Sequence, residues 1–355
     1  MADWLDGVRA LLPGARVELV EQLGGSQRSQ VRRVRADGRT VIVKQFAGSG
    51  DGWVREAAAL SVLPPRAPVP RLIAENTAPP IVIMTDEGSR GSVADALLGN
   101  DRAAAASAVI AWAEAIARLH QATTGMRQAF RDALAQRAGD LPVADSAVAD
   151  DLDSAAGVVE EHCGTLGVEV PGGALAQLRS LADRLGADGP AALTPTDACP
   201  DNNIWTDSGD LVLIDFEGAQ WRHVAWDVAY LTAPWPTCWC SWRIPAEVGE
   251  RAIEAYESVF PLPQGFRSEI EAARTGWAFI STSWFLRQAL VEGVRPAKQD
   301  LPAPSRRAMV LHRLAQASGT GDDLAVLAAR LHAALTERWG PVPLAYAPAF
   351  RGAGG

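Results

Sequence analysis

The chain has 355 residues, enough for two domains or lobes, and its 48% hydrophobic and 21% charged residues are typical of a globular protein. Its 33 basic and 42 acidic residues give a net charge of -9. This excess of acids disfavours nonspecific nucleic-acid binding, which depends on Lys and Arg, and favours a cationic small molecule as partner.

The N-terminus and the cysteines indicate a cytoplasmic protein without a membrane partner. The first residues contain acids and no long apolar stretch, so we predict no secretory signal. No uncharged apolar run approaches the roughly 20 residues that a membrane span requires. Cys163, Cys199, Cys238 and Cys240 are too few for a disulfide scaffold and have no accompanying metal-binding motif. We therefore expect reduced core cysteines and no zinc site.

The first 87 residues are predicted to form a small lobe of sheet and helix. Alternating apolar residues and turn signals predict strands over residues 16–23, 31–36, 40–46 and 81–84 and a helix over residues 52–63. An Asp-Gly pair marks a tight turn between the second and third of these strands.

Helices dominate the predicted structure beyond residue 88. Residues 107–120 place apolar side chains at helical spacing, and a strand pair is predicted at Ile204-Trp205 and residues 211–214. We predict a large, mainly helical lobe over residues 88–345, with a helical insertion at about 126–190. Residues 346–355 are expected to form a flexible tail.

Residues 194–219 hold six acids and no Lys or Arg, a pattern that fits either a solvated loop and hairpin or carboxylates arranged around a metal. Asp197 and Asn202 are five residues apart, and Asp215 follows beyond the predicted hairpin, which would bring them together. An Asp beside an acceptor hydroxyl orients it and accepts its proton, while an Asn carbonyl and a second Asp are hard ligands for Mg²⁺.

Two features of the small lobe match the other requirements of phosphoryl transfer. The first predicted hairpin contains Gly24, Gly25 and Ser26, small residues that let backbone N–H groups approach a polyphosphate. Lys44 ends an apolar strand, and Glu56 follows in the next helix, where its carboxylate can fix the ammonium group. Each feature is common by itself, so the prediction depends on their order along the chain.

In this order the motifs resemble those of the aminoglycoside phosphotransferase family and the related choline-kinase-like enzymes. The resemblance covers roughly residues 16–340 and depends on Val-Ile-Val-Lys44, Arg55-Glu56-Ala-Ala-Ala-Leu, Asp197-xxxx-Asn202, Asp215-Phe-Glu217 and Trp226-Asp227-Val-Ala-Tyr-Leu. It implies an α+β, bilobal protein-kinase-like fold, with a nucleotide-binding lobe at 1–87 and a catalytic and acceptor-binding lobe at 88–345.

The resemblance also implies a role for each residue in the large-lobe motifs. Asp197 would be the catalytic base, and Asn202 and Asp215 would hold Mg²⁺. Asp227 would brace the catalytic loop, a structural role. The role of Glu217 stays open between an exposed acid and a residue behind the metal ligands.

In the small lobe the resemblance implies a site for ATP or GTP. Lys44, held by Glu56, would bind the α- and β-phosphates beneath the glycine-containing hairpin. The backbone from Thr85 to Glu87 would bind the edge of the adenine.

The chain departs from the family pattern directly before Asp197. The family usually has His-Gly at this place, whereas this chain has Pro195-Thr196. Because that His generally supports the loop and does no chemistry, we expect phosphotransferase activity, with a nucleotide-binding pseudokinase regulator as the alternative. A protein kinase is disfavoured, since Glu217 replaces the Gly of an Asp-Phe-Gly motif and no Ala-Pro-Glu segment follows.

The acceptor is expected to be a small molecule with a hydroxyl group. An aminoglycoside-like or other antibiotic is the first prediction, and a metabolite alcohol (amino alcohol, sugar or nucleoside) is the second. Five tryptophans between residues 221 and 242 either stack on the acceptor or pack in the core. Residues 139–161, with seven acids and no base, either receive a polycationic acceptor, as the insertion of similar enzymes does, or form a solvated helix face. The histidines have no metal spacing, and the oligomeric state is not indicated.

Overall fold

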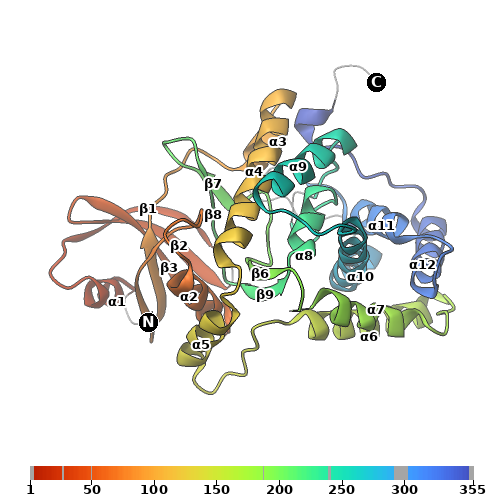
Figure 1. Cartoon of the computed structure of the whole chain (residues 1–355), viewed down its shortest axis with the longest axis horizontal. Coiled ribbons are helices and arrows are strands. Elements are labelled where there is room, and N and C mark those ends of the chain that lie inside the picture. Colours follow the sequence, from red (N-terminus) through yellow and green to blue (C-terminus); the bar gives the residue numbers. More distant parts are fainter. Residues whose placement is uncertain are drawn as a thin grey trace.

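The computed structural model describes residues 4–25, 28–48, 50–186, 188–238, 241–291 and 303–351. These residues form two lobes, one built on a five-stranded sheet and the other mainly of helices (Figure 1). Among the described residues, no helix is both long and apolar enough to cross a membrane.

The small lobe consists of an antiparallel sheet with the strand order β1-β2-β3-β5-β4 and two helices. Its elements are α1 (Trp4–Leu11), β1 (Val17–Gly25), β2 (Ser29–Ala36), β3 (Arg39–Phe46), α2 (Gly52–Val62), β4 (Leu72–Thr77) and β5 (Pro80–Thr85). The four predicted strands and the predicted helix are confirmed. Helix α1, which is short, and strand β4, whose side chains are only partly buried, were not predicted from the sequence.

The alternation of side chains along β3 directs Lys44 toward α2. Val41 and Val43 point to the face of the sheet that packs on α1, where they join a cluster with Val8 and Ile83. Lys44 points to the opposite face, because successive residues of a strand alternate. That face meets α2, so the strand register alone brings Lys44 to the helix that carries Glu56.

The large lobe is organised around the long helix α4, whose Val109, Trp112 and Ile116 are fully buried. The other helices and two small strand pairs surround this helix (Figure 1). The helices are α3 (Val93–Leu98), α4 (Arg102–Thr123), α5 (Arg127–Ala138), α6 (Val148–Leu166), α7 (Ala174–Leu185), α8 (Ala225–Val228), η1 (Ala229–Leu231), α9 (Ala246–Val259), α10 (Arg267–Val291), α11 (Arg306–Ala317), α12 (Asp323–Trp339) and η2 (Pro348–Phe350).

The two strand pairs are β6 (Ala191–Thr194) with β9 (Gln220–His223), and β7 (Asn203–Trp205) with β8 (Leu211–Leu213). The second pair is the predicted hairpin. Helices α5, α6 and α7 occupy the predicted insertion; α6 packs on α7 and α10, so this part of the chain shares the core of the large lobe.

The predicted flexible tail is wrong for residues 346–351. Ala347, Ala349 and Phe350 are buried, and η2 packs against α3 and α4. The Ala347 N–H donates to the Arg243 carbonyl at 2.8 Å, which fastens the segment to the loop before α9. The rest of that prediction, residues 352–355, lies outside the described residues.

Candidate active site

The candidate site is built from the loop between β6 and β7 and from the residues that follow β8. The loop contains Asp197 and Asn202, and the segment after β8 contains Asp215. The Asn202 carbonyl accepts a hydrogen bond from the Ile214 N–H at 3.1 Å, so the two segments are fastened together beside the hairpin. The Asn202 side-chain nitrogen donates to the Asp197 carbonyl at 2.9 Å, which leaves the amide oxygen as the end suited to a metal ion.

Lys44 joins the two lobes through carboxylates. Its Nζ lies 2.5 Å from Glu56 Oε2, 2.6 Å from Asp215 Oδ1 and 3.1 Å from Glu217 Oε2. Burial acts to lower the pKa of Lys44, but the charges of the three carboxylates outweigh it and raise the pKa above its usual value. The ammonium is therefore charged, and Glu217, whose role the sequence left open, is part of this cluster.

A cleft of about 510 Å³ lies between the lobes at this cluster, a size typical of small-molecule sites. Its lining contains most of the residues singled out from the sequence: Gly25, Lys44, Glu56, Thr85, Glu87, Asn202 and Asp215. Of the remaining residues, Gly24 lies in β1 opposite Val31, and Ser26 is outside the described residues. Among the described residues, Asp197 is not part of this lining, and its carboxylate accepts a hydrogen bond from Thr237.

Two parts of the small lobe line the cleft: the hairpin between β1 and β2, and the connector that follows β5. At Gly25 a Cβ atom would lie 2.7 Å from the Ser29 carbonyl oxygen, so the hairpin needs glycine at this position. Arg28, just beyond that turn, reaches Glu217 across the cleft at 2.9 Å. On the connector to the large lobe, the Thr85 hydroxyl donates to Glu87.

Asp197 is partly buried and accepts a hydrogen bond from the Thr237 hydroxyl. Burial raises the pKa of Asp197 to about 6, and the nearby charges of Asp215 and Asp201 act in the same direction, while the hydrogen bond from Thr237 opposes them. A carboxylate with a raised pKa close to neutrality suits a general base.

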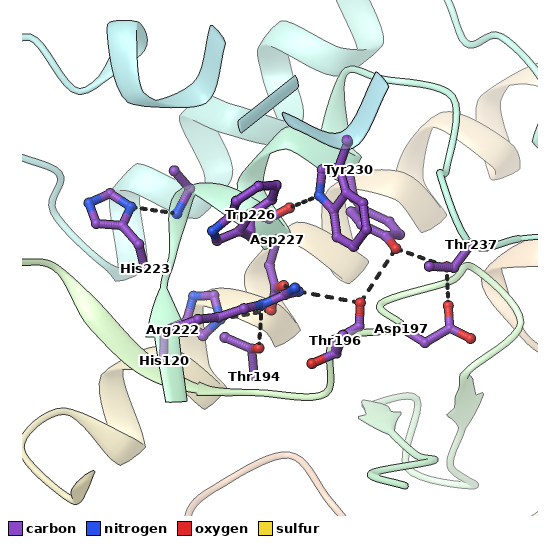
Figure 2. Close-up of polar contacts among 12 residues, drawn as sticks. His120, Thr194, Thr196, Asp197, Arg222, His223, Trp226, Asp227, Tyr230 and Thr237 are labelled. Carbon is purple, nitrogen blue, oxygen red and sulfur yellow. Dashed lines mark hydrogen bonds and ion pairs between the residues drawn. The ribbon is translucent and has the colours of Figure 1, made fainter. Parts of the chain in front are cut away.

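A buried polar network lies behind Asp197 (Figure 2). The Arg222 guanidinium donates to Asp227 Oδ1 at 2.5 Å, to the Thr194 hydroxyl at 2.8 Å and to the Thr196 carbonyl at 3.3 Å. His120 Nε2 lies 3.1 Å from the other carboxylate oxygen of Asp227. Burial acts to raise the pKa of Asp227, but Arg222 and His120 outweigh it and hold that pKa below its usual value.

This network bears on the departure from the family pattern at Pro195-Thr196. Thr196 has a φ of +68°, a conformation that glycine adopts freely and that costs a β-branched residue energy. The Arg222 guanidinium donates to its carbonyl, and the Tyr230 hydroxyl oxygen lies 3.4 Å from the same carbonyl oxygen. Arg222 thus connects Asp227 to the loop, and no local pattern in the sequence indicated it, since all four residues of β9 are buried.

The prediction of reduced cysteines is wrong for one pair. Cys199 and Cys238 form a disulfide, with Cα atoms 5.6 Å apart. They are separated by 39 residues, so no spacing pattern revealed the pairing, which arises because the chain after η1 returns to the loop that contains Asp197. Cys163 is free and buried, and Cys240 lies outside the described residues.

The aromatic and histidine residues near the site are mostly core residues. Trp221, Trp226, Trp235 and Trp242 are buried, which favours packing over stacking on an acceptor, and Trp239 lies outside the described residues. His223 is also buried, stacked on Phe266 with ring centroids 5.5 Å apart.

Comparison with known proteins identifies the family of the chain. The model of the phosphotransferase enzyme family matches residues 20–267, which is more than half of the chain. The chain therefore belongs to the phosphotransferase enzyme family and is an enzyme of that class. No curated protein matches it.

Solved structures show the same fold at low sequence identity. An ethanolamine kinase from Plasmodium vivax is 13% identical, with 78% of this chain and 77% of that chain covered and a TM-score of 0.54. A putative aminoglycoside phosphotransferase from Ralstonia eutropha is 13% identical, with 94% and 97% covered and a TM-score of 0.54. The gentamicin complex of APH(2")-IIa is 12% identical, with 91% and 98% covered and a TM-score of 0.51. The predicted bilobal protein-kinase-like fold is confirmed.

Proposed function

We propose that the protein transfers the γ-phosphoryl group of ATP, or of GTP, to a hydroxyl group of a small molecule. The observation that carries this proposal is the contact of Lys44 with both Glu56 and Asp215, in a cleft that also contains Asn202. Such a cluster places a cation for the phosphates beside hard oxygen ligands. Asp197 lies in the same β6–β7 loop as Asn202, and in this proposal it orients the acceptor hydroxyl and takes its proton.

The residues present fit Mg²⁺. The carboxylate oxygens of Glu56, Asp215 and Glu217 lie within 4.8 Å of one another, and the Asn202 amide oxygen belongs to the adjoining loop. Oxygen donors of this kind are the ligands that Mg²⁺ prefers, and we assign Asn202 and Asp215 to it. When bound, the ion neutralises charge that develops on the phosphate oxygens.

The charges around Asp197 favour a cationic acceptor. Burial is the main cause of the raised pKa of Asp197, and the negative charges of Asp215 and Asp201 add to it. An ammonium group on the acceptor would relieve this repulsion. We therefore propose an aminoglycoside-like antibiotic as the first acceptor, in line with the gentamicin and streptomycin complexes of a protein with this fold, and an amino alcohol as the second. Both would be encountered in the cytoplasm, together with ATP.

The experiment is a panel of aminoglycosides and amino alcohols screened for ADP release and for acceptor phosphorylation with the purified enzyme, Mg²⁺ and ATP. Asp197→Asn should abolish transfer and retain the nucleotide-induced rise in melting temperature. Asp207→Asn, at the exposed turn of the β7–β8 hairpin, is the matched control and should transfer at the wild-type rate. Nucleotide binding without transfer to any alcohol would instead indicate a pseudokinase, and equal activity of Asp197→Asn and the wild type would exclude Asp197 as the base.

A further inference from the structure

The segment of residues 232–238, which follows η1, contacts Asp197 through Thr237. Thr237, near its end, directs its hydroxyl at Asp197 Oδ1 and donates a hydrogen bond to it (Figure 2). This is the relationship that an acceptor hydroxyl needs to a general base, which must lie within hydrogen-bond reach of the proton it removes. A side chain of the protein thus occupies the position expected for the acceptor.

Two further contacts hold the Thr237 hydroxyl in this position. The Tyr230 hydroxyl lies 2.8 Å from Thr237 Oγ1. Since Thr237 donates its proton to Asp197, Tyr230 is the donor in this second bond. The residue next to Thr237, Cys238, is joined by the disulfide to Cys199, two residues after Asp197. The bond from Tyr230 and the disulfide at the next residue therefore both keep Thr237 Oγ1 close to the Asp197 carboxylate.

We propose that Thr237 is an intramolecular acceptor, phosphorylated by its own active site when no small-molecule acceptor is bound. This inference depends on the proposed function, since it uses the same base and the same nucleotide. Thr237 Oγ1 attacks the γ-phosphorus of ATP and forms an O–P bond. The bond from that phosphorus to the bridging oxygen breaks, its electron pair leaves with ADP, and the hydroxyl proton passes to Asp197.

The main test is to incubate the full chain with Mg²⁺ and ATP without acceptor and to locate phosphate by peptide mass spectrometry. The expected result is one phosphate per chain, on Thr237. Thr237→Val should remove it, and Thr237→Ser, which keeps a hydroxyl, should retain labelling at this position. Thr232→Val is the matched control: Thr232 lies in the same segment, but its hydroxyl accepts from Arg274 at 3.0 Å, and labelling should equal that of the wild type.

A second measurement tests whether the transfer is intramolecular. The first-order rate constant of labelling should not change on dilution, and in a mixture with wild-type enzyme the Asp197→Asn variant should stay unlabelled. A labelled Asp197→Asn chain would overturn the proposal, because the phosphate would then come from another molecule. A small-molecule acceptor that the enzyme can phosphorylate should slow the labelling of Thr237, since its hydroxyl and that of Thr237 need the same place beside Asp197.

Failure of this inference and failure of the proposed function give different results. If the wild type phosphorylates an added acceptor in an Asp197-dependent way but Thr237 carries no phosphate, the inference is wrong and the proposed function stands. If nucleotide neither shifts the melting temperature nor supports transfer to any hydroxyl, both are wrong. Phosphate on another residue of the wild-type chain also contradicts the assignment of Thr237.

Discussion

Arg222 and Asp227 form an ion pair that is almost completely inaccessible to water, with Nη2 2.5 Å from Oδ1 and side-chain exposures of 3% and 0%. The same guanidinium reaches the Thr196 carbonyl, directly before Asp197. We predict that Arg222→Met lowers the free energy of unfolding by about 3–5 kcal/mol, because it leaves Asp227 buried with one of its partners missing. Urea unfolding measures this loss.

Arg222→Lys separates the charge from the geometry. It keeps a cation near Asp227, but an ammonium cannot reproduce the planar fork that reaches Thr194, Thr196 and Asp227 together. We expect it to recover part of the stability while kcat stays low and the KM for nucleotide changes little. Arg179→Met, which removes an exposed pair with Asp153, is the control and should cost about 0–1 kcal/mol. Equal losses for Arg222→Met and Arg179→Met would contradict the bracing role.

The raised pKa of Asp197 predicts the pH dependence of the reaction. With a pKa of about 6 in the free enzyme, the base loses its proton as the pH rises through that value. We expect kcat/KM to fall on acidification below about pH 6 and to level off above it, since this parameter reports the free enzyme. A profile that stays flat from about pH 5 to pH 8 would be inconsistent with a base of this pKa.

The raised pKa of Asp197 also makes the free energy of unfolding depend on pH. Because burial raises the pKa of Asp197, its favourable contribution is present at low pH and is lost as the pH rises through about 6. Asp197→Asn should therefore melt at a higher temperature than the wild type at neutral pH, even though we expect it to be inactive. Asp207→Asn, whose carboxylate is exposed, should melt like the wild type. A lower melting temperature for Asp197→Asn would mean that the carboxylate stabilises the loop more than its burial costs.

The parts of the site that were predictable from the sequence come from segments close together along the chain. Lys44 and Glu56 lie on consecutive elements, β3 and α2, so the alternation of the strand and the spacing of the helix bring them together. Asn202 and Asp215 lie at the two ends of one hairpin. In both cases local structure determines the distance, and residue order was a sufficient guide.

The parts that were not predictable depend on contacts between distant segments. Thr237 meets Asp197 because the chain after η1 turns back over the catalytic loop, and the Cys199–Cys238 disulfide has the same origin. No motif in the sequence distinguishes Arg222 from the other charged residues. The pairing of β9 with β6 brings its guanidinium to the Thr196 carbonyl. Phe350 belongs to a segment whose composition suggested a tail, but it is buried near α3 and α4.

The disulfide between Cys199 and Cys238 predicts that the stability depends on reductant. The crosslink closes a loop of 39 residues, and by chain entropy it stabilises the folded state by up to about 4 kcal/mol. Adding a reductant should therefore lower the melting temperature of the wild type. Cys238→Ser should melt at the reduced value and be insensitive to the reductant. Cys163→Ser, which changes the free cysteine, should retain the full response, and a wild type insensitive to reductant would contradict a stabilising crosslink.

Gly276 in α10 is predicted to be required for packing and not for backbone flexibility. A Cβ atom there would lie 2.5 Å from Cη2 and 2.9 Å from Cζ3 of Trp226. That indole cannot move easily, because it is 1% exposed and its Nε1 donates to the Leu185 carbonyl at 2.9 Å. We expect Gly276→Ala to lower the free energy of unfolding by about 1–3 kcal/mol, the usual cost of overpacking.

Gly157→Ala provides the matched comparison in a second helix. Gly157 lies in α6, and apart from its chain neighbours and the backbone of its own helix no atom comes within 4 Å of the Cβ it would gain. Because alanine favours helix more than glycine does, this variant should be more stable by about 0.5–1 kcal/mol. The two variants make the same chemical change with opposite expected signs, and urea unfolding of both distinguishes packing from helix propensity. If Gly276→Ala were also stabilising, Trp226 would have to move, and the segment from β9 to η1 that carries Asp227 would be less rigid than its contacts indicate.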